Sequence, residues 1–180
     1  MKRNEIKIAL ILLALLLTLG VLLGGQKLYH ANMVEKPIIK ELHALSYVES
    51  AAISKTDGIY QIKVHIRQPG NLKNEYQEID KIIAAKIKKR PYEIKIGDRR
   101  DAFLQNQLQK MELSLYEALA QNSYLDLEQR FADTAARDHF IYRLQIDQQR
   151  LYVQISRGDK FLYEIIERND ADKVAGEKKE

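Results

Sequence analysis

The residues best suited to chemistry in this chain are four histidines and two pairs of carboxylates. His30, His43, His65 and His139 are scattered, and no two of them have the H-x-x-x-H or H-x-x-E-H spacing that brings metal ligands together. We therefore expect no metal site and no bound cofactor.

The carboxylate pairs are Asp98 with Asp101 and Asp126 with Glu128. Such pairs can act as general acid and base in glycoside cleavage. Both pairs flank expected turns or helix starts, however, where acidic side chains are common as caps. The chain has no cysteine or tryptophan, no G-x-S-x-G nucleophile motif and no G-x-G-x-x-G or Walker phosphate loop. We expect capping roles and a protein that is not an enzyme.

Charge is distributed unevenly along the chain. Positions 81–100 contain eight basic and two acidic residues, whereas positions 112–138 contain six acidic and two basic residues. The candidate basic interaction patch comprises Lys86, Lys88, Lys89, Arg90, Lys95, Arg99 and Arg100. The candidate acidic patch comprises Glu112, Glu117, Asp126, Glu128 and Asp133.

Three interpretations of this asymmetry are open. The charges can be solvated faces with internal ion pairs, which contribute little to stability. The basic end of one copy can meet the acidic helices of another, head to tail. The basic patch can also bind anionic lipid head groups. We do not expect nucleic acid as a partner, because this part of the chain is expected outside the membrane.

The strongest single signal is the segment 8–25, which has 18 residues without a charge and follows Lys2, Arg3 and Lys7. As a helix it would be about 27 Å long, close to the roughly 30 Å hydrocarbon core of a bilayer. It predicts a transmembrane signal-anchor helix. Because basic residues favour the cytoplasmic side, residues 1–7 are expected there and the rest of the chain outside.

Two alternatives concern this segment. A cleaved signal peptide, and hence a secreted soluble protein, fits poorly, since the apolar run is long and lacks an A-x-A cleavage site; a lipoprotein is excluded because there is no cysteine to acylate. Gly20 and Gly24 lie on one helix face and could bring two helices together in a dimer. Glycine is also simply common in membrane helices.

The full sequence is 46% hydrophobic and 30% charged. The part that follows residue 25 contains no Gly/Ser-rich or Pro-rich linker. We expect a juxtamembrane segment at 26–33 and a compact α+β domain at 34–168. Its possible subunits are 34–98 and 99–168. The charged tail, 169–180, has no apolar period and is expected to be disordered.

Apolar spacing gives the order αββαβ in the first unit and ααβββ in the second. The first unit has a hairpin signal at Asp57-Gly58, and in the second Ser123 is expected to cap a helix. We expect the helices to cover one face of antiparallel or mixed sheet. The expected helices are 34–45, 72–87, 104–119 and 123–135, and the expected strands are 48–54, 60–66, 92–96, 140–146, 151–156 and 161–167.

These observations predict a single-pass membrane protein with an extracytoplasmic binding or scaffold domain, an accessory subunit of an envelope assembly. Its partners would be the lipid bilayer and either another protein or a second copy. The alternative is an extracytoplasmic ligand-sensing or hydrolytic domain whose site has no sequence signature. A deep apolar pocket with converging polar groups would favour that alternative.

Overall fold

The structure is a computed structural model, and it describes residues 11–19, 34–67 and 70–168. Residues 11–19 are helical and carry exposed leucine and isoleucine side chains. Within the described ranges, none of the helices combines the length and the apolar character needed to cross a membrane.

Several expectations fall outside the described ranges. The expected membrane helix 8–25 lies only partly within them, and Gly20 and Gly24 lie outside. The expected juxtamembrane segment 26–33 and the charged tail 169–180 also lie outside.

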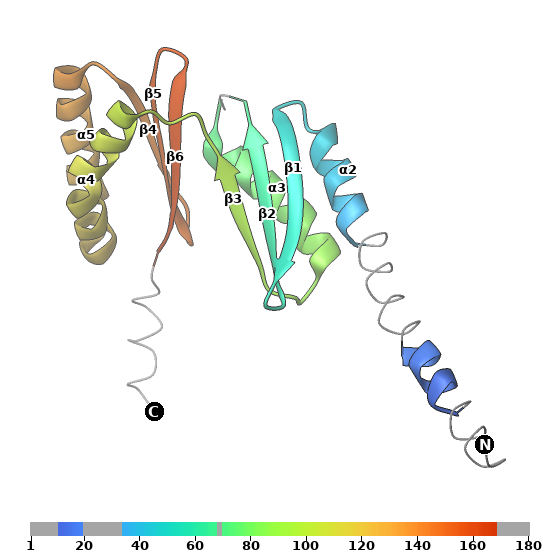
Figure 1. The fold of residues 1–180 in the computed structure, drawn as a ribbon. Helices are drawn as coiled ribbons and strands as arrows, with labels where there is room; N and C mark the ends of the chain where they lie inside the picture. The colour runs from blue at the N-terminus through green and yellow to red at the C-terminus, as the bar shows by residue number, and fades with distance from the viewer. Residues whose placement is uncertain (1–10, 20–33, 68–69, 169–180) are drawn as a thin grey trace, which may run out of the picture.

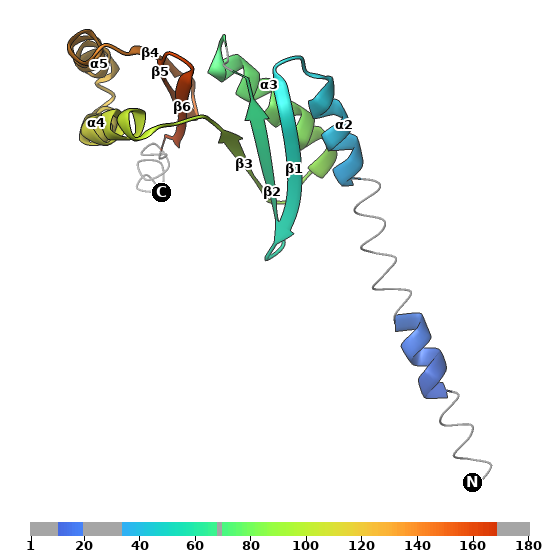
Figure 2. The ribbon, with the colours of Figure 1, turned by 45° about the horizontal axis from the view of Figure 1, so that its top comes forward.

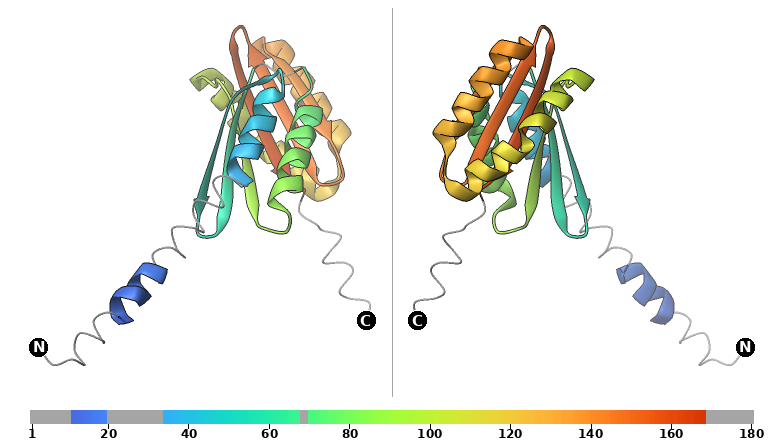
Figure 3. Two further views of the ribbon diagram at one scale, coloured as in Figure 1. Left: turned by 90° about the vertical axis from the view of Figure 1, so that its right-hand side faces the viewer. Right: turned by 90° about the vertical axis from the view of Figure 1, so that its left-hand side faces the viewer.

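The first unit confirms the predicted element order αββαβ. Its strands form a mixed sheet, sheet A, in the order β1-β2-β3, with β1–β2 antiparallel and β2–β3 parallel. Helices α2 and α3 lie side by side over one face of this sheet (Figure 3, left). The elements are α2 (Lys36–Ala44), β1 (Val48–Thr56), β2 (Ile59–Ile66), α3 (Leu72–Ile87) and β3 (Tyr92–Gly97).

Local sequence explains how these elements begin and turn. Asp57 and Gly58 both have positive φ, 52° and 83°, as a two-residue hairpin turn requires, so the predicted hairpin is confirmed. The Asn71 side chain accepts a hydrogen bond from the backbone N of Asn74 at 3.1 Å and caps α3. Along β2 the apolar residues Tyr60 and Ile62 are fully buried and face the helices.

The second unit confirms the order ααβββ. Its strands form an antiparallel meander, sheet B, in the order β4-β5-β6. Asn122 adopts the left-handed conformation that ends α4. Ser123 stands at the N-cap of α5 as expected, but its side chain makes no capping hydrogen bond there. The elements are α4 (Ala102–Gln121), α5 (Tyr124–Asp138), β4 (Ile141–Ile146), β5 (Arg150–Arg157) and β6 (Lys160–Glu167).

Sheet B lies between the two helical layers (Figures 1 and 2). One face packs on α4 and α5 (Figure 3, right) through Leu151, Val153 and other residues of one apolar cluster. The other face sends Tyr152 and Tyr163 into the core of the first unit. The expectation that helices cover one sheet face therefore holds for both sheets, but it did not include the second face of sheet B, which is covered by the first unit.

Candidate functional site

A polar network connects α3 to sheet B at the junction of the two units, and Arg150 is its centre. The side chain of Arg150 is only 17% exposed, lies 3.5 Å from the Asp80 carboxylate and stacks over the Tyr76 ring at 5.0 Å. Tyr92 donates a hydrogen bond to Asp80 at 2.6 Å. The guanidinium thus joins β5 to α3, and Asp80 connects both to β3.

Asp147, in the turn before β5, is the second centre of this network. It accepts hydrogen bonds from the Tyr152 hydroxyl and the Gln77 amide, both at 2.8 Å, and from the backbone N of Gln149 and Arg150. Burial acts to raise the pKa of Asp147, but these hydrogen bonds outweigh it and hold the pKa below its ordinary value. The carboxylate is therefore ionised at neutral pH.

The tyrosine hydroxyls of the network remain protonated at neutral pH. Burial raises the pKa of Tyr76 to about 12, and burial together with the hydrogen bond to Asp80 raises that of Tyr92 further. An open hollow of about 410 Å³ lies beside the network and is lined by Gln77, Lys81 and residues 147–150. Because its carboxylates and guanidinium are already engaged with each other, the arrangement is suited to holding the units together.

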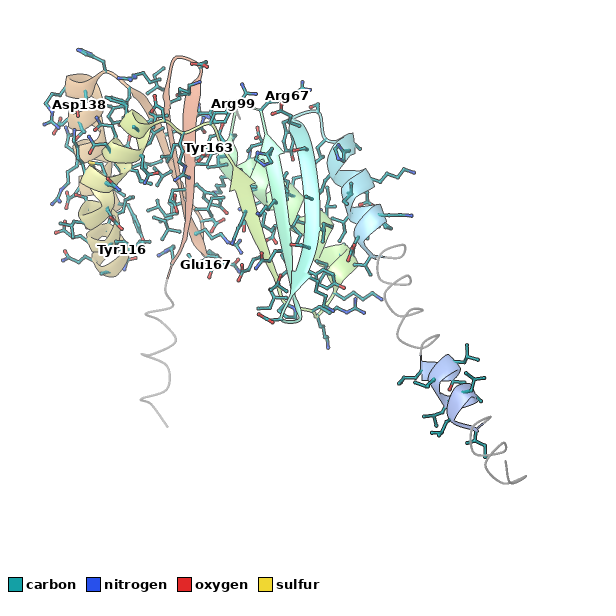
Figure 4. The ribbon with its side chains drawn as sticks, in the orientation of Figure 1. Arg67, Arg99, Tyr116, Asp138, Tyr163 and Glu167 are labelled. Carbon is teal, nitrogen blue, oxygen red and sulfur yellow. The ribbon has the colours of Figure 1, made fainter. Side chains whose placement is uncertain are left out.

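A second set of contacts joins β3 to β6, where the two strands converge. The backbone N of Arg99 donates to Phe161 O at 3.1 Å, and Asp98 accepts from the backbone N of Tyr163 at 3.1 Å. Arg100 pairs with Asp98 at 2.7 Å. Figure 4 labels Arg99 and Tyr163 at this junction. Sequence reasoning missed this role of Asp98, since nothing local marks a contact with position 163.

The two carboxylate pairs are not engaged as pairs in the described structure. Asp101 accepts a hydrogen bond from the backbone N of Leu104 at 2.8 Å, which confirms its predicted capping role, whereas Asp98 contacts β6. Asp126 lies in the first turn of α5, and Glu128 accepts from the Tyr142 hydroxyl at 2.9 Å. The described residues hold no cluster of three or more potential metal ligands; His30 is not among them.

The expected basic patch is divided between two ends of the first unit. Lys86, Lys88, Lys89 and Arg90 lie at the C-terminal end of α3, whereas Arg99 and Arg100 follow the far end of β3, which is about 20 Å long. Lys95 lies between them on the exposed face of sheet A. Some charges are paired internally: Lys86 with Glu41 at 2.6 Å and Arg99 with Glu49 at 3.6 Å.

The expected acidic patch is also divided. Glu128 turns towards β4 through Tyr142, and Glu112 lines a hollow between α4 and β6. The other three acidic residues lie on the outer surface of the helical layer with two leucines, Leu113 and Leu125, which are 85% and 87% exposed. We name this surface the α4–α5 face; it comprises Leu113, Glu117, Leu125, Asp126 and Asp133.

Fold and surface define a class of architecture: an α+β protein of two small sheets whose described polar clusters are mostly paired internally. No family model matches this chain, and no match was found among the curated proteins or the solved structures. The surfaces of the molecule itself therefore provide the evidence for its function.

Proposed function

We propose that this chain is a single-pass membrane protein whose extracytoplasmic α+β domain binds another protein or a second copy of itself. It would serve as a non-catalytic scaffold or accessory subunit of an envelope assembly. The observation that carries this proposal is the α4–α5 face, where two almost fully exposed leucines share the surface with Asp126, Asp133 and the ion pair of Glu117 with Arg130 at 2.9 Å.

Leucine side chains with this exposure are costly in water, at about 25 cal/mol per Å² of apolar surface. Exposed apolar groups with a charged surround are typical of protein interfaces. Sheet B separates the α4–α5 face from the basic end of α3, so the two charged surfaces lie on different layers of the molecule. This separation suits a head-to-tail contact, because the two surfaces of one copy cannot neutralise each other.

The anchor is supported by the uncharged segment 8–25 and by the helical residues 11–19. Their large apolar side chains are 48% to 66% exposed around the helix. A helix that is apolar on all sides is stable when surrounded by lipid or protein. Lys2, Arg3 and Lys7 support a cytoplasmic N-terminus.

Site-specific crosslinking in whole cells tests the binding function. A photo-reactive residue at position 113 or 125 should give an adduct of higher mass, whereas the same residue at Lys63, on the exposed face of sheet A, should not. Leu125→Lys should remove the adduct formed at position 113, and Leu113→Lys the adduct formed at position 125, without lowering the melting temperature. The matched control is Ile141→Lys, since Ile141 is 73% exposed but lies on β4.

The identity of the partner is tested by charge reversal. Replacing Lys88, Lys89 and Arg90 by glutamate should abolish the adduct if the partner is a second copy and leave it intact if the partner is a different protein. Equal adducts at positions 113 and 63 would contradict the proposal. The anchor is tested separately: alkaline carbonate should leave the protein in the membrane pellet, and protease added to spheroplasts should digest residues 34–168.

The ligand-sensing alternative requires a deep apolar cavity. The hollows found among the described residues have volumes of about 320 to 500 Å³ and are open to solvent, with polar or charged residues in their linings. No specific observation favours that alternative, so we do not propose it.

A further inference from the structure

Strand β6 is an edge strand of sheet B, and its register determines which backbone groups face outward. Arg157 and Lys160 are partners across the two-residue turn at Gly158 and Asp159. Ladder hydrogen bonds of an antiparallel hairpin fall on alternate pairs counted from such a turn. The residues whose N–H and C=O point away from β5 are therefore Phe161, Tyr163, Ile165 and Glu167.

The first half of this edge is already covered. Phe161 accepts from the backbone N of Arg99, and Tyr163 contacts the side chains of Asp98 and Arg100. Beyond these contacts no described strand pairs with β6 on this side. The backbone groups of Ile165 and Glu167 are thus left as an unpaired edge, the kind of site to which a further strand can add.

Two hollows lie on opposite sides of this unpaired edge. One, of about 360 Å³, lies towards α4 and is lined by Glu164 and Ile166. The other, of about 320 Å³, lies towards sheet A and is lined by Ile165 and Glu167. Figure 4 labels Glu167 at the end of β6 away from the Tyr163 junction. Because side chains alternate along a strand, an added strand would direct successive side chains into one hollow and then the other.

The linings of the two hollows differ in chemistry. On the α4 side, two carboxylates, Glu112 and Glu164, share one cation, Arg100, which lies 3.7 Å from Glu164 and 2.7 Å from Asp98. Burial raises the pKa of Glu164, and the nearby carboxylates of Asp98 and Glu112 raise it too, against the opposing effect of Arg100. This hollow favours a basic side chain.

The hollow on the sheet A side combines aromatic and aliphatic side chains with charged ones. Tyr76, Tyr92, Ile94 and Ile165 contribute to its lining. Its charged residues balance, since Glu93 and Glu167 stand against Lys95 and Arg150. This hollow favours an apolar side chain.

We propose that the free edge of β6 at Ile165 and Glu167 binds an extended segment of another protein in which basic and apolar residues alternate. Backbone hydrogen bonds supply affinity, and the two hollows supply specificity. Among the described residues this alternation recurs at 62–66, but these belong to β2, the central strand of sheet A, which is already paired on both sides.

The test measures peptide binding to the full chain in detergent micelles by fluorescence anisotropy. The probe is a labelled eight-residue peptide of alternating lysine and isoleucine, and the control is a peptide of the same composition with the lysines contiguous. We expect the alternating peptide to bind at least tenfold more tightly. Equal binding of the two peptides would overturn the proposal.

Two variants separate the backbone from the side-chain contribution. Ile165→Pro removes an outward N–H while leaving the ladder to β5 intact, and should weaken binding at least tenfold, whereas Ile165→Val should not. The pair Glu112→Gln and Glu164→Gln should weaken the lysine peptide about fivefold and leave a glutamine–isoleucine peptide unchanged. This pair keeps the proposal testable if the proline variant fails to fold.

Hydrogen exchange locates the bound peptide. The amides of Ile165 and Glu167 should gain protection, and protection confined to the edges formed by β1 or β4 would overturn the proposal. The Leu113→Lys, Leu125→Lys variant should bind the peptide normally, because the α4–α5 face is a separate surface. Failure of this proposal and failure of the proposed function are therefore distinguishable.

Discussion

Sheets A and B carry a similar alternation of apolar residues, yet they differ in how many of their faces are buried. In β2 of sheet A, Lys63 and His65 are exposed, and every second residue is buried against α2 and α3. In β5 of sheet B, Leu151 and Tyr152 are neighbours in sequence and both are at most 2% exposed. A tyrosine on the face of a strand that points away from its own unit's core can therefore be a core residue of the neighbouring unit.

The largest expected effect tests this difference directly. Tyr152→Ala should lower the free energy of unfolding by about 3–5 kcal/mol, because it removes a buried ring from the shared core. Lys63→Ala, on the exposed face of sheet A, should change it by less than about 0.5 kcal/mol. Urea denaturation of the full chain in detergent measures both. Similar losses for the two variants would contradict the difference in burial.

A smaller effect tests the connection between the units. Arg150→Ala should destabilise the protein by about 2–3 kcal/mol, because it leaves Asp80 without a cationic partner and exposes the Tyr76 ring. Arg150→Lys retains the charge but not the planar stacking, and should restore part of the loss. Circular dichroism melting of the two variants provides the measurement, and no recovery with lysine would show that charge is unimportant there.

The helix starts of the two units give the next prediction. Asn71→Ala should cost about 1 kcal/mol, because the Asn71 side chain caps α3 in the first unit. Ser123→Ala in the second unit should cost only a few tenths of a kcal/mol, because this side chain makes no capping hydrogen bond. Urea midpoints for the two variants decide the matter; a larger loss for Ser123 would mean that it caps α5 in solution.

The smallest expected effect is a pH dependence of opposite sign in the two units. Burial raises the pKa of Glu75, on α3, so the folded state favours its protonated form. The stabilising contribution is therefore full below the ordinary glutamate value of 4.5 and is lost as the pH rises above that value and through the raised pKa of the folded state. Glu75→Gln keeps an oxygen to accept from the backbone N of Gly70 and should raise the urea midpoint at pH 7 but not at pH 4.

Asp147 supplies the matched contrast, because its pKa is held low in the folded state. Its contribution is present above the ordinary aspartate value and is lost as the pH falls through the lowered one. Asp147→Asn should therefore lower the urea midpoint at pH 7 and have less effect at strongly acidic pH. The same direction of change for both variants would contradict the two assignments.

Much of the fold could be predicted because its signals are local. The two-residue turn at Asp57 and Gly58 needs positive φ, and the sequence places suitable residues there. Asp101 directly precedes a helical stripe of apolar residues, which is the position of an N-cap, and it caps α4. Alternation and helical spacing depend on residues close in sequence, so the order of ten elements from α2 to β6 could be read from the chain.

The candidate sites were less predictable because they depend on distant residues. The basic run between positions 81 and 100 is continuous in sequence, but β3 carries its two ends apart. Asp98 meets the backbone of Tyr163, 65 positions away. The exposure of Leu113 and Leu125 did have a local signal, because each lies two residues, about 200° round the helix, from a residue of the buried stripe, Met111 or Leu127.

Secondary structure, turns and the separation of charge along the chain follow from the order of residues alone, because they depend on backbone preferences and side-chain spacing over a few residues. The burial of both faces of sheet B, the contacts of Arg150 and Asp98 between the units, and the position of the β6 edge between two hollows arise only when distant segments pack together. Burial and pairing depend on which surfaces meet, and the packing that forms is the one that removes apolar area from water.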